Sequence, residues 1–272
     1  MGDYMFSKIA YSDLINNLKA KKEVDAVFIT GSFAVSKTSS ASDLDLVIVL
    51  KNNKEKIKSV YEKIHGIFAD IFFFDKTDLK RLVRAKKLDG NSMDGILLSW
   101  IQKADIKFDK SGLLTKIKRW ASKIHLFISE ADKKDILQKI SYSYNRNERY
   151  FKSKNKKYLE ILNILLINSV IELVIGFLTL RNKPWRGEKD AIAFIEKRSP
   201  SFRHLFLKLN KAMSIESKMK IYKKMVKKVL PKGFSLYSYK EPVCISKNKN
   251  TKEEMNKLKI FWKRISSKTI EK

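Results

Sequence analysis

The stretch Phe28–Leu50 reads FITGSFAVSKTSSASDLDLVIVL and decides the fold of the first half of the chain. Two apolar runs, FIT and LVIVL, flank a turn of small residues, and the unbroken second run predicts a strand buried on both faces. Asp43 and Asp45 stand at the start of that strand, and residues two apart project from the same face. Buried carboxylates cost several kcal/mol unless they are paired or bind a metal. The pair therefore predicts a cation site.

A third carboxylate is available on the next predicted strand, Ile67–Asp75, where Asp70 stands between apolar residues in FADIFFF. Asp75 competes for the same place, but it lies on the opposite strand face and at the strand end, where it is predicted to cap a helix. Carboxylates side by side stay ionised only next to a cation. Oxygen ligands suit Mg²⁺, and Asp43, Asp45 and Asp70 together are enough to hold two ions for phosphoryl or nucleotidyl transfer.

The turn between the two apolar runs supplies a second half of the site. Gly31 and Ser32 follow a strand and lead into a short helix, which exposes backbone N–H groups and one hydroxyl. Such a concavity binds phosphate oxygens. Metal-binding carboxylates beside a phosphate-binding turn indicate a nucleoside triphosphate as the substrate.

Strand and helix patterns alternate up to about residue 112, which predicts an α+β domain with a mixed sheet and flanking helices. From there the pattern is helical, and an all-α bundle is expected. The predicted domains are a catalytic domain at 1–112, a helical acceptor-binding domain at 113–230 and a basic tail at 231–272. The expected strands are 24–30, 44–50, 67–75 and 104–112, and the expected helices are 3–21, 54–66, 77–88, 158–180, 202–213, 217–230 and 252–265.

The apolar segment 158–180 is long enough to raise the question of a membrane span. Four polar residues within it fall in one half of the helix circumference: Glu160, Asn163, Asn168 and Glu172. Carboxylates in mid-span are costly. A helix in the centre of a soluble bundle is therefore expected, with no membrane partner.

The net charge is concentrated in the second half of the chain. The chain has 58 Lys+Arg and 29 Asp+Glu residues. Residues 1–110 contain 19 of the basic and 15 of the acidic residues, for a net charge of +4. Residues 111–272 hold the remaining 39 and 14, for a net charge of +25. Clustered positive charge favours a polyanionic partner such as nucleic acid. A composition bias from an AT-rich genome is the alternative, but it does not readily explain the near-neutral first half.

The cysteine and histidine content excludes two classes of site. Cys244 is the single cysteine, so the chain has no internal disulfide, and three scattered histidines offer no zinc cluster. The beginning of the sequence has no apolar signal region. A reducing cytoplasm is therefore the expected location.

The segment GSFAVSKTSSASDLDL resembles the signature of the DNA polymerase beta-like nucleotidyltransferase superfamily, in which Gly-Ser is followed by Asp-x-Asp and a third acid on a later strand. The resemblance covers residues 24–110. It implies a nucleotidyltransferase that binds Mg²⁺ and a nucleoside triphosphate, with ATP favoured. The family commonly has a second glycine four residues after the serine, and Ser36 replaces it here. The second half is more weakly similar, through LRNKPWRGEKD, to helical domains of small nucleotidyltransferases.

The helical half offers weaker candidates. In the enzymes that the chain resembles, a basic residue of the helical domain reaches the triphosphate, which implies Arg186 or Lys189. The general base for the acceptor hydroxyl is Glu148 or Glu172, although an ion pair between Glu148 and Lys152 is the simpler interpretation of the former. Aromatic and basic residues also interleave here, a pattern that favours core and rim over nucleic-acid stacking: Tyr142, Tyr144, Arg146, Arg149, Tyr150, Phe151 and Lys152.

The predicted reaction moves a nucleoside monophosphate from the triphosphate to a hydroxyl and releases pyrophosphate. A half with a net charge of +25 suits an anionic acceptor such as RNA, for example a tRNA end, better than a cationic antibiotic. The alternatives are a transferase acting on a small molecule or a protein, or a non-catalytic RNA-binding or toxin–antitoxin partner with the same fold. Three intact carboxylates argue against the last.

Overall fold

The structure is a computed structural model and describes residues 11–36, 38–39, 42–85, 87–240, 243–244 and 252–266. The chain divides into two compact units, Met1–Leu126 and Phe127–Lys272. This division lies beyond the predicted domain boundary at residue 112. The reason is helix α6 (Leu113–Ala121), because its Leu114 and Ile117 are buried in the core of the first unit.

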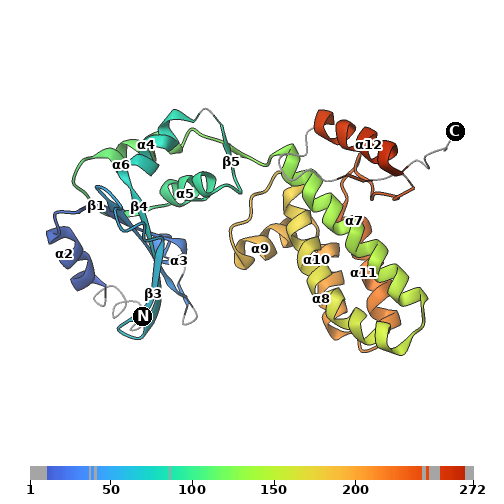
Figure 1. The fold of residues 1–272 in the computed structure, drawn as a ribbon. Helices are drawn as coiled ribbons and strands as arrows, with labels where there is room; N and C mark the ends of the chain where they lie inside the picture. The colour runs from blue at the N-terminus through green and yellow to red at the C-terminus, as the bar shows by residue number, and fades with distance from the viewer. Residues whose placement is uncertain are drawn as a thin grey trace. The chain divides into compact units, whose positions relative to one another are not determined.

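The first unit is built on a five-stranded mixed sheet in the order β3-β4-β2-β1-β6 (Figure 1). Strands β2 and β4 are parallel, and each of the other neighbouring pairs is antiparallel. Strand β1 is buried along its whole length, and the middle strand β2 has five of its seven residues buried, as its unbroken apolar run predicts. The strands are β1 (Val24–Thr30), β2 (Leu44–Leu50), β3 (Ser59–Ile64), β4 (Ile67–Asp75) and β6 (Asp105–Asp109), with short strands β5 (Leu88–Asp89) and β7 (Leu126–Phe127) elsewhere in the chain.

Helices cover both faces of this sheet (Figure 1). Helices α4 (Lys76–Arg84), α5 (Met93–Gln102) and α6 pack on one face against the odd-numbered side chains of β2, such as Val47 and Val49. Helices α2 (Ser12–Ala20) and α3 (Gly31–Ala34) cover the other face. Residues 3–10 of the predicted helix 3–21 lie outside the described residues, and its later part forms α2. The α+β fold class predicted from the sequence is confirmed.

The predicted helix at 54–66 is wrong. Strand β3 occupies Ser59–Ile64 and forms an antiparallel hairpin with β4. His65 and Gly66 both have positive φ, at 46° and 84°, which is the backbone of a two-residue hairpin turn. Asn53 does not start a helix, because its side chain exchanges hydrogen bonds with the backbone of Ile57 and closes a loop.

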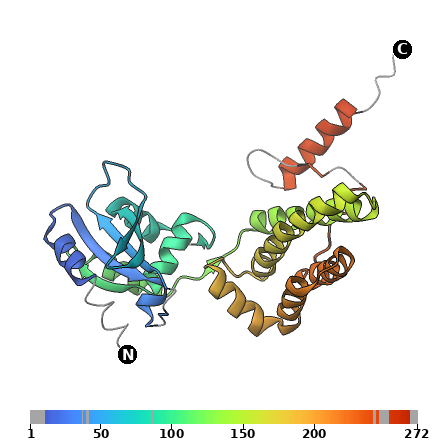
Figure 2. The same ribbon diagram turned by 90° about the horizontal axis from the view of Figure 1, so that it is seen from below.

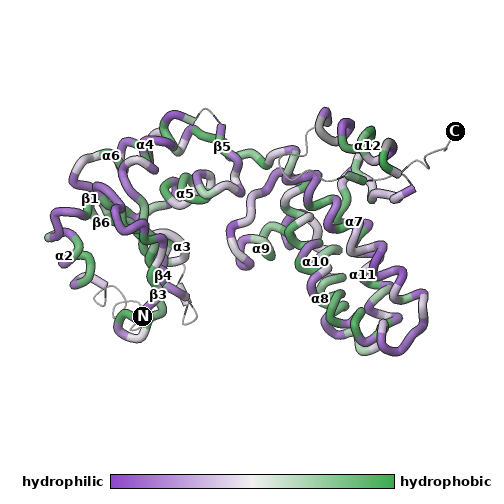
Figure 3. The backbone as a smooth tube through the Cα atoms, viewed as in Figure 1, coloured by the Kyte–Doolittle hydropathy of each residue, from purple (hydrophilic) through white to green (hydrophobic). Residues whose placement is uncertain are grey.

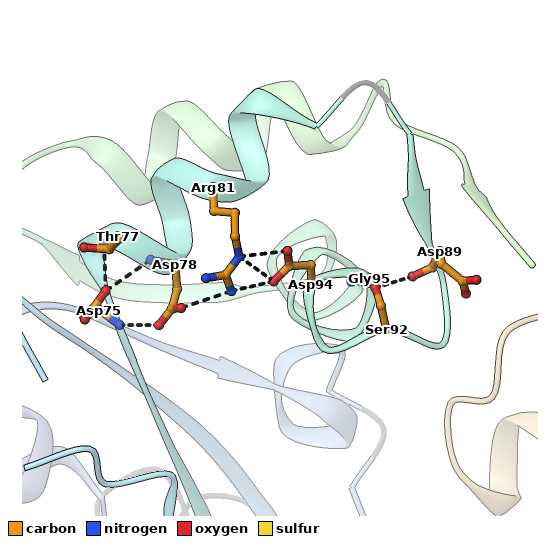
Figure 4. A network of polar contacts seen from close by, with 8 residues as sticks. All are labelled: Asp75, Thr77, Asp78, Arg81, Asp89, Ser92, Asp94 and Gly95. Carbon is orange, nitrogen blue, oxygen red and sulfur yellow. Dashed lines mark hydrogen bonds and ion pairs between the residues drawn. The ribbon is translucent and has the colours of Figure 1, made fainter. Parts of the chain in front are cut away.

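Asp75 caps helix α4, as the sequence predicts. Its Oδ1 accepts hydrogen bonds from the N–H groups of Thr77 and Asp78, and Asp78 Oδ2 accepts one from the N–H of Asp75 (Figure 4). Arg81 then joins this cap to α5, because its guanidinium group donates hydrogen bonds to both carboxylate oxygens of Asp94 at N–O distances of 2.7–3.2 Å. These contacts join α4 to α5, two of the three helices that cover this face of the sheet.

Replacing Asp75 by alanine is expected to lower the free energy of unfolding by about 1 kcal/mol at neutral pH, because a helix loses its cap. Burial alone would raise the pKa of Asp75, but hydrogen bonds from Asp78, Thr77 and Asn53 outweigh it and hold the pKa below 3.8. The stabilisation is therefore present above pH 3.8 and is lost as the pH falls through the folded-state pKa. Urea unfolding across this range measures it.

Asp13→Ala is the matched control, since Asp13 is an exposed first-turn carboxylate on α2, a helix without a side-chain cap. Its substitution should change the free energy of unfolding by a few tenths of a kcal/mol at most. Equal losses in Asp75→Ala and Asp13→Ala would show that the cap contributes nothing.

The second unit is helical, with one core formed by α7, α8, α9, α10 and α11 (Figure 2). Its longest helices, α7 and α8, pack side by side, and α11 packs against α8. Gly176 of α8 makes close packing possible, because a Cβ there would meet Ile140 Cδ1 of α7. The helices are α7 (Glu130–Lys152), α8 (Lys156–Thr179), α9 (Glu188–Arg198), α10 (Pro200–Lys211), α11 (Ile215–Val229) and α12 (Lys252–Ser266).

Helix α8 is the apolar segment that raised the membrane question, and hydrophobic residues recur along it from end to end (Figure 3). Among the described residues it is the one helix long and apolar enough to cross a membrane. Residues such as Leu162, Leu173 and Phe177 are buried in the core of the unit. Glu160 and Asn163 of the polar stripe are exposed, and Glu172 is half-buried.

The beginning of the predicted tail packs against the helical unit. Phe234 and Leu236 contact its core, and the N–H of Tyr237 donates a hydrogen bond to Ser141 Oγ of α7 at 3.0 Å. Residues 231–237 are therefore part of the folded unit, because they cover apolar surface that the helices leave open.

Candidate active site

Neighbouring strands bring the three predicted carboxylates together. Asp45 of β2 and Asp70 of β4 are direct partners in the parallel register, and Asp43 immediately precedes β2. One carboxylate oxygen from each of the three residues lies within 4.8 Å of the other two. The spacing of Asp-x-Asp on a strand and a third acid on the next strand therefore produces one acidic cluster, which we call the acidic triad: Asp43, Asp45 and Asp70.

Gly31 touches the acidic triad because of the register of the neighbouring strand. Thr30, the last residue of β1, pairs with Asp45, so the chain leaves the sheet beside that carboxylate. Gly31 has a φ of +66°, and a Cβ built on it would overlap Asp45 Oδ2. Glycine is required here for both reasons.

Ser32 follows Gly31 in the short helix α3 and places a hydroxyl next to the triad-bearing strand. Its Oγ is buried and, within the part of the chain that the structure describes, has no hydrogen-bond partner. Buried hydroxyls are nearly always hydrogen-bonded. The unused hydrogen-bonding capacity of Ser32 is what a bound phosphate oxygen would satisfy.

Ser36, which stands where the family commonly has a second glycine, has a left-handed backbone. Its φ is +53°, in the region that glycine occupies without strain. Serine adopts this conformation at some cost in free energy.

The electrostatics of the triad fit a bound cation. Burial and then the charge of Asp43 raise the pKa of Asp70 above 3.8. Asp70 Oδ1 is also buried without a hydrogen-bond partner in the described structure. Three oxygen donors, one of them unsatisfied and destabilised by its neighbour, match the requirements of a hard divalent ion.

The remaining predicted site residues lie in the helical unit, and their roles stay predictions. Glu148 Oε1 forms an ion pair with Lys223 Nζ of α11 at 2.7 Å, and Oε2 lies 3.8 Å from Lys152. Arg186 is half-buried, and burial lowers the pKa of its guanidinium although Asp190 opposes the shift. Lys189 is exposed in the first turn of α9.

The helical unit also contains a polar cluster that was not predicted from the sequence. Asn147 of α7 donates a hydrogen bond to Ser169 of α8 at 2.8 Å, and both side chains are buried. The hydroxyl of Tyr222 on α11 interacts with them and with Glu172 and Arg146, and burial raises its pKa. Polar positions at helical spacing on α7 and α8 were the available signal, and Arg146 and Glu172 are the two members of the cluster that the sequence patterns above include. Buried polar atoms without a hydrogen-bond partner collect here, among the described residues, as they do at the acidic triad.

The comparison with protein families identifies the first unit. Residues 12–98 match the model of the family "Polymerase beta, Nucleotidyltransferase". This range includes Gly31, Ser32 and the acidic triad, and the first unit is therefore a nucleotidyltransferase domain of the polymerase beta-like superfamily.

Two further comparisons add little. Among solved structures, the chain is similar to a nucleotidyltransferase-like protein from Exiguobacterium sibiricum 255-15, with 12% sequence identity and a TM-score of 0.40, over 82% of this chain and 74% of that one. No curated protein matches the sequence.

Proposed function

We propose that the protein is a Mg²⁺-dependent enzyme that transfers a nucleoside monophosphate from a nucleoside triphosphate, ATP in the first place, to a hydroxyl group and releases pyrophosphate. The observation that carries this proposal is the meeting of three carboxylates within 4.8 Å, next to a glycine-serine turn with an unsatisfied hydroxyl. A nucleotidyltransferase domain around them supports the same reaction class.

Each residue of the site has a role in this reaction. Gly31 lets the chain turn closely beside Asp45, and its backbone with the Ser32 hydroxyl binds the triphosphate. Asp43 and Asp45 hold the metal, and Asp70 completes the donor set. When bound, one or two divalent ions neutralise the developing phosphate charge and activate the attacking oxygen.

We propose RNA as the acceptor, on the evidence of charge. Residues 111–272 carry a net charge of +25, and such a field attracts a polyanion and raises its association rate. Binding to RNA through phosphate contacts weakens steeply with added salt. The same field disfavours a cationic acceptor.

A small hydroxylated molecule is the second candidate acceptor. The polar cluster around Tyr222 favours it, because Glu172 Oε2 and Asn147 Oδ1 are buried there without hydrogen-bond partners in the described structure. Under this alternative Glu172 or Glu148 serves as the base. A protein acceptor, or a non-catalytic role with the same fold, has no specific structural support.

The test is incubation with each α-³²P-labelled nucleoside triphosphate, Mg²⁺, and total RNA or an RNA-depleted cell extract. We expect label in the RNA fraction, and we expect it to disappear with a chelator and to fall at least about tenfold between 50 and 200 mM salt. If the label appears on small molecules and does not change with salt, RNA is rejected as the acceptor and a small hydroxylated molecule takes its place. Absence of labelled product from every fraction, and of released pyrophosphate, would reject nucleotidyl transfer.

A further inference from the structure

An exposed face of α7 combines aromatic and cationic side chains. At 3.6 residues per turn, Lys139, Tyr142, Arg146 and Arg149 fall within an arc of roughly 80°. Tyr142 is 57% exposed, although its neighbours Tyr144 and Tyr150 pack against the core. The sequence pattern favoured core and rim for this whole set, and Tyr142 is the member that departs from it.

Guanidinium groups lie against the aromatic rings of this face. Arg146 Cζ is 5.6 Å from the centroid of the Tyr142 ring, and Arg149 Cζ is 5.8 Å from that of Tyr150. Such cation–π pairs hold the arginine side chains in place without using their hydrogen-bond donors. Arg149 is exposed, so its donors are open to partners such as phosphate oxygens, whereas Arg146 is half-buried and its Nε is buried.

A second exposed tyrosine comes from the segment that follows α11. Tyr239 is 39% exposed, and its ring meets Tyr237 edge-on with centroids 6.5 Å apart. Tyr239 lies two residues after Tyr237, whose N–H is hydrogen-bonded to Ser141, the residue before Tyr142, so this segment crosses α7 next to Tyr142. The hydrogen bond from the Tyr237 N–H to Ser141 anchors this segment on α7.

The backbone at Tyr239 is strained, with a φ of +54°. A bulky residue rarely occupies the left-handed region, and where it does, the surrounding structure holds it there, often at a functional site. The ring of this strained residue is 39% exposed, and Tyr239 is not among the described residues that pack against the core of the helical unit.

The charges around these rings are mainly positive. Glu148 is the acidic residue between Lys139 and Lys152, and it pairs with Lys223 on another side of the helix. Asp135, two turns before Tyr142, is a nearby acid among the residues that the structure describes, and its charge acts on Tyr237. An anionic partner with flat rings therefore fits this face better than an apolar or an acidic protein surface.

We propose that Tyr142, Tyr239, Arg146 and Arg149, called the tyrosine platform, bind single-stranded RNA by stacking its bases on the rings and pairing its phosphates with the guanidinium groups. Every base has a π-face, so such a platform binds without strict sequence preference. The choice of RNA rests on the proposed function and specifies where the acceptor strand is held. Catalysis is not required for this binding.

Fluorescence anisotropy of a labelled oligoadenylate RNA tests the platform, with neither nucleotide nor metal present. Tyr142→Ala and Tyr239→Gly are each expected to weaken binding about tenfold. Glycine at 239 removes the ring and relieves the strained backbone, so its effect does not come from unfolding. Tyr142→Phe should bind as the wild type does, because it keeps the ring. Arg149→Ala should weaken binding and lower the salt dependence.

Matched controls lie outside the platform. Tyr61→Ala removes a ring that is 60% exposed on β3, and Lys208→Ala removes one exposed cation of α10. Both should bind RNA nearly as the wild type does.

Equal affinity of wild type, Tyr142→Ala and Tyr239→Gly would overturn the platform even if RNA is the acceptor. Loss of RNA binding in these variants, with nucleotidyl transfer only to small molecules, would support the platform and reject RNA as the acceptor. Failure of the wild type to bind RNA would reject both.

Discussion

Asparagine at both Asp43 and Asp45 is expected to lower the rate of nucleotidyl transfer at least about a thousandfold, which corresponds to roughly 4 kcal/mol of activation free energy. The substitution keeps the shape of both side chains and removes the two negative charges that hold the cation. The fold should survive, because like charges repel each other, and the charge of Asp43 adds to burial in raising the pKa of Asp70. The melting temperature without metal is therefore expected to stay constant or to rise.

Metal binding gives a second measurement that does not depend on turnover. Mg²⁺ should raise the melting temperature of the wild type, since a ligand that binds the folded state stabilises it. The double variant should show no such rise. Asp13→Asn, at an exposed position on α2, is the control and should behave as the wild type in both assays. A double variant that retains wild-type turnover would end the assignment of the acidic triad as the metal site.

Alanine at Gly31 is expected to lower turnover about a hundredfold and the free energy of unfolding by about 1–2 kcal/mol. The stability loss comes from the positive φ, which alanine adopts only with strain. The activity loss comes from the new Cβ, which would overlap Asp45 Oδ2 and force that carboxylate away from its partners. Displacement of a reacting or ligand group by about 1 Å costs about a hundredfold in rate.

Gly112 provides a matched control for this substitution. Its φ is +69°, close to that of Gly31, but a Cβ there would meet nothing within 4 Å. Gly112→Ala should therefore lose similar stability in a urea unfolding experiment and keep its activity. If both variants lose activity equally, the effect of Gly31→Ala comes from backbone strain, and the contact with Asp45 has no role.

The acidic triad was predictable because each part of the argument is local. An unbroken apolar run places β2 in the centre of the sheet, and the two-residue period puts Asp43 and Asp45 on one face. Asp70 stands among apolar residues of the next buried strand, so a neighbouring cation was the simplest explanation for its charge. The conclusion that Asp75 is a cap followed from its place at the strand end, and the structure confirms it.

Features that depend on tertiary packing were not predictable in the same way. Residues 54–66 are rich in charged residues at helical spacing, and only the His65–Gly66 turn and the partner strand β4 make β3 a strand. The polar cluster around Tyr222 needs three helices to meet, and no single segment carries it. Helix α6 joins the first unit through side chains whose partners lie far away in the sequence.

The glycine-serine turn and all three acidic ligand candidates come from one short part of the chain, between Gly31 and Asp70, folded onto adjacent strands. Under the proposed function, the residues that bind the triphosphate are thus encoded in a different part of the sequence from the later helices, for which we propose the role of binding the acceptor. We therefore expect that substitutions in those helices can change the acceptor without disturbing the carboxylates, which is useful for engineering.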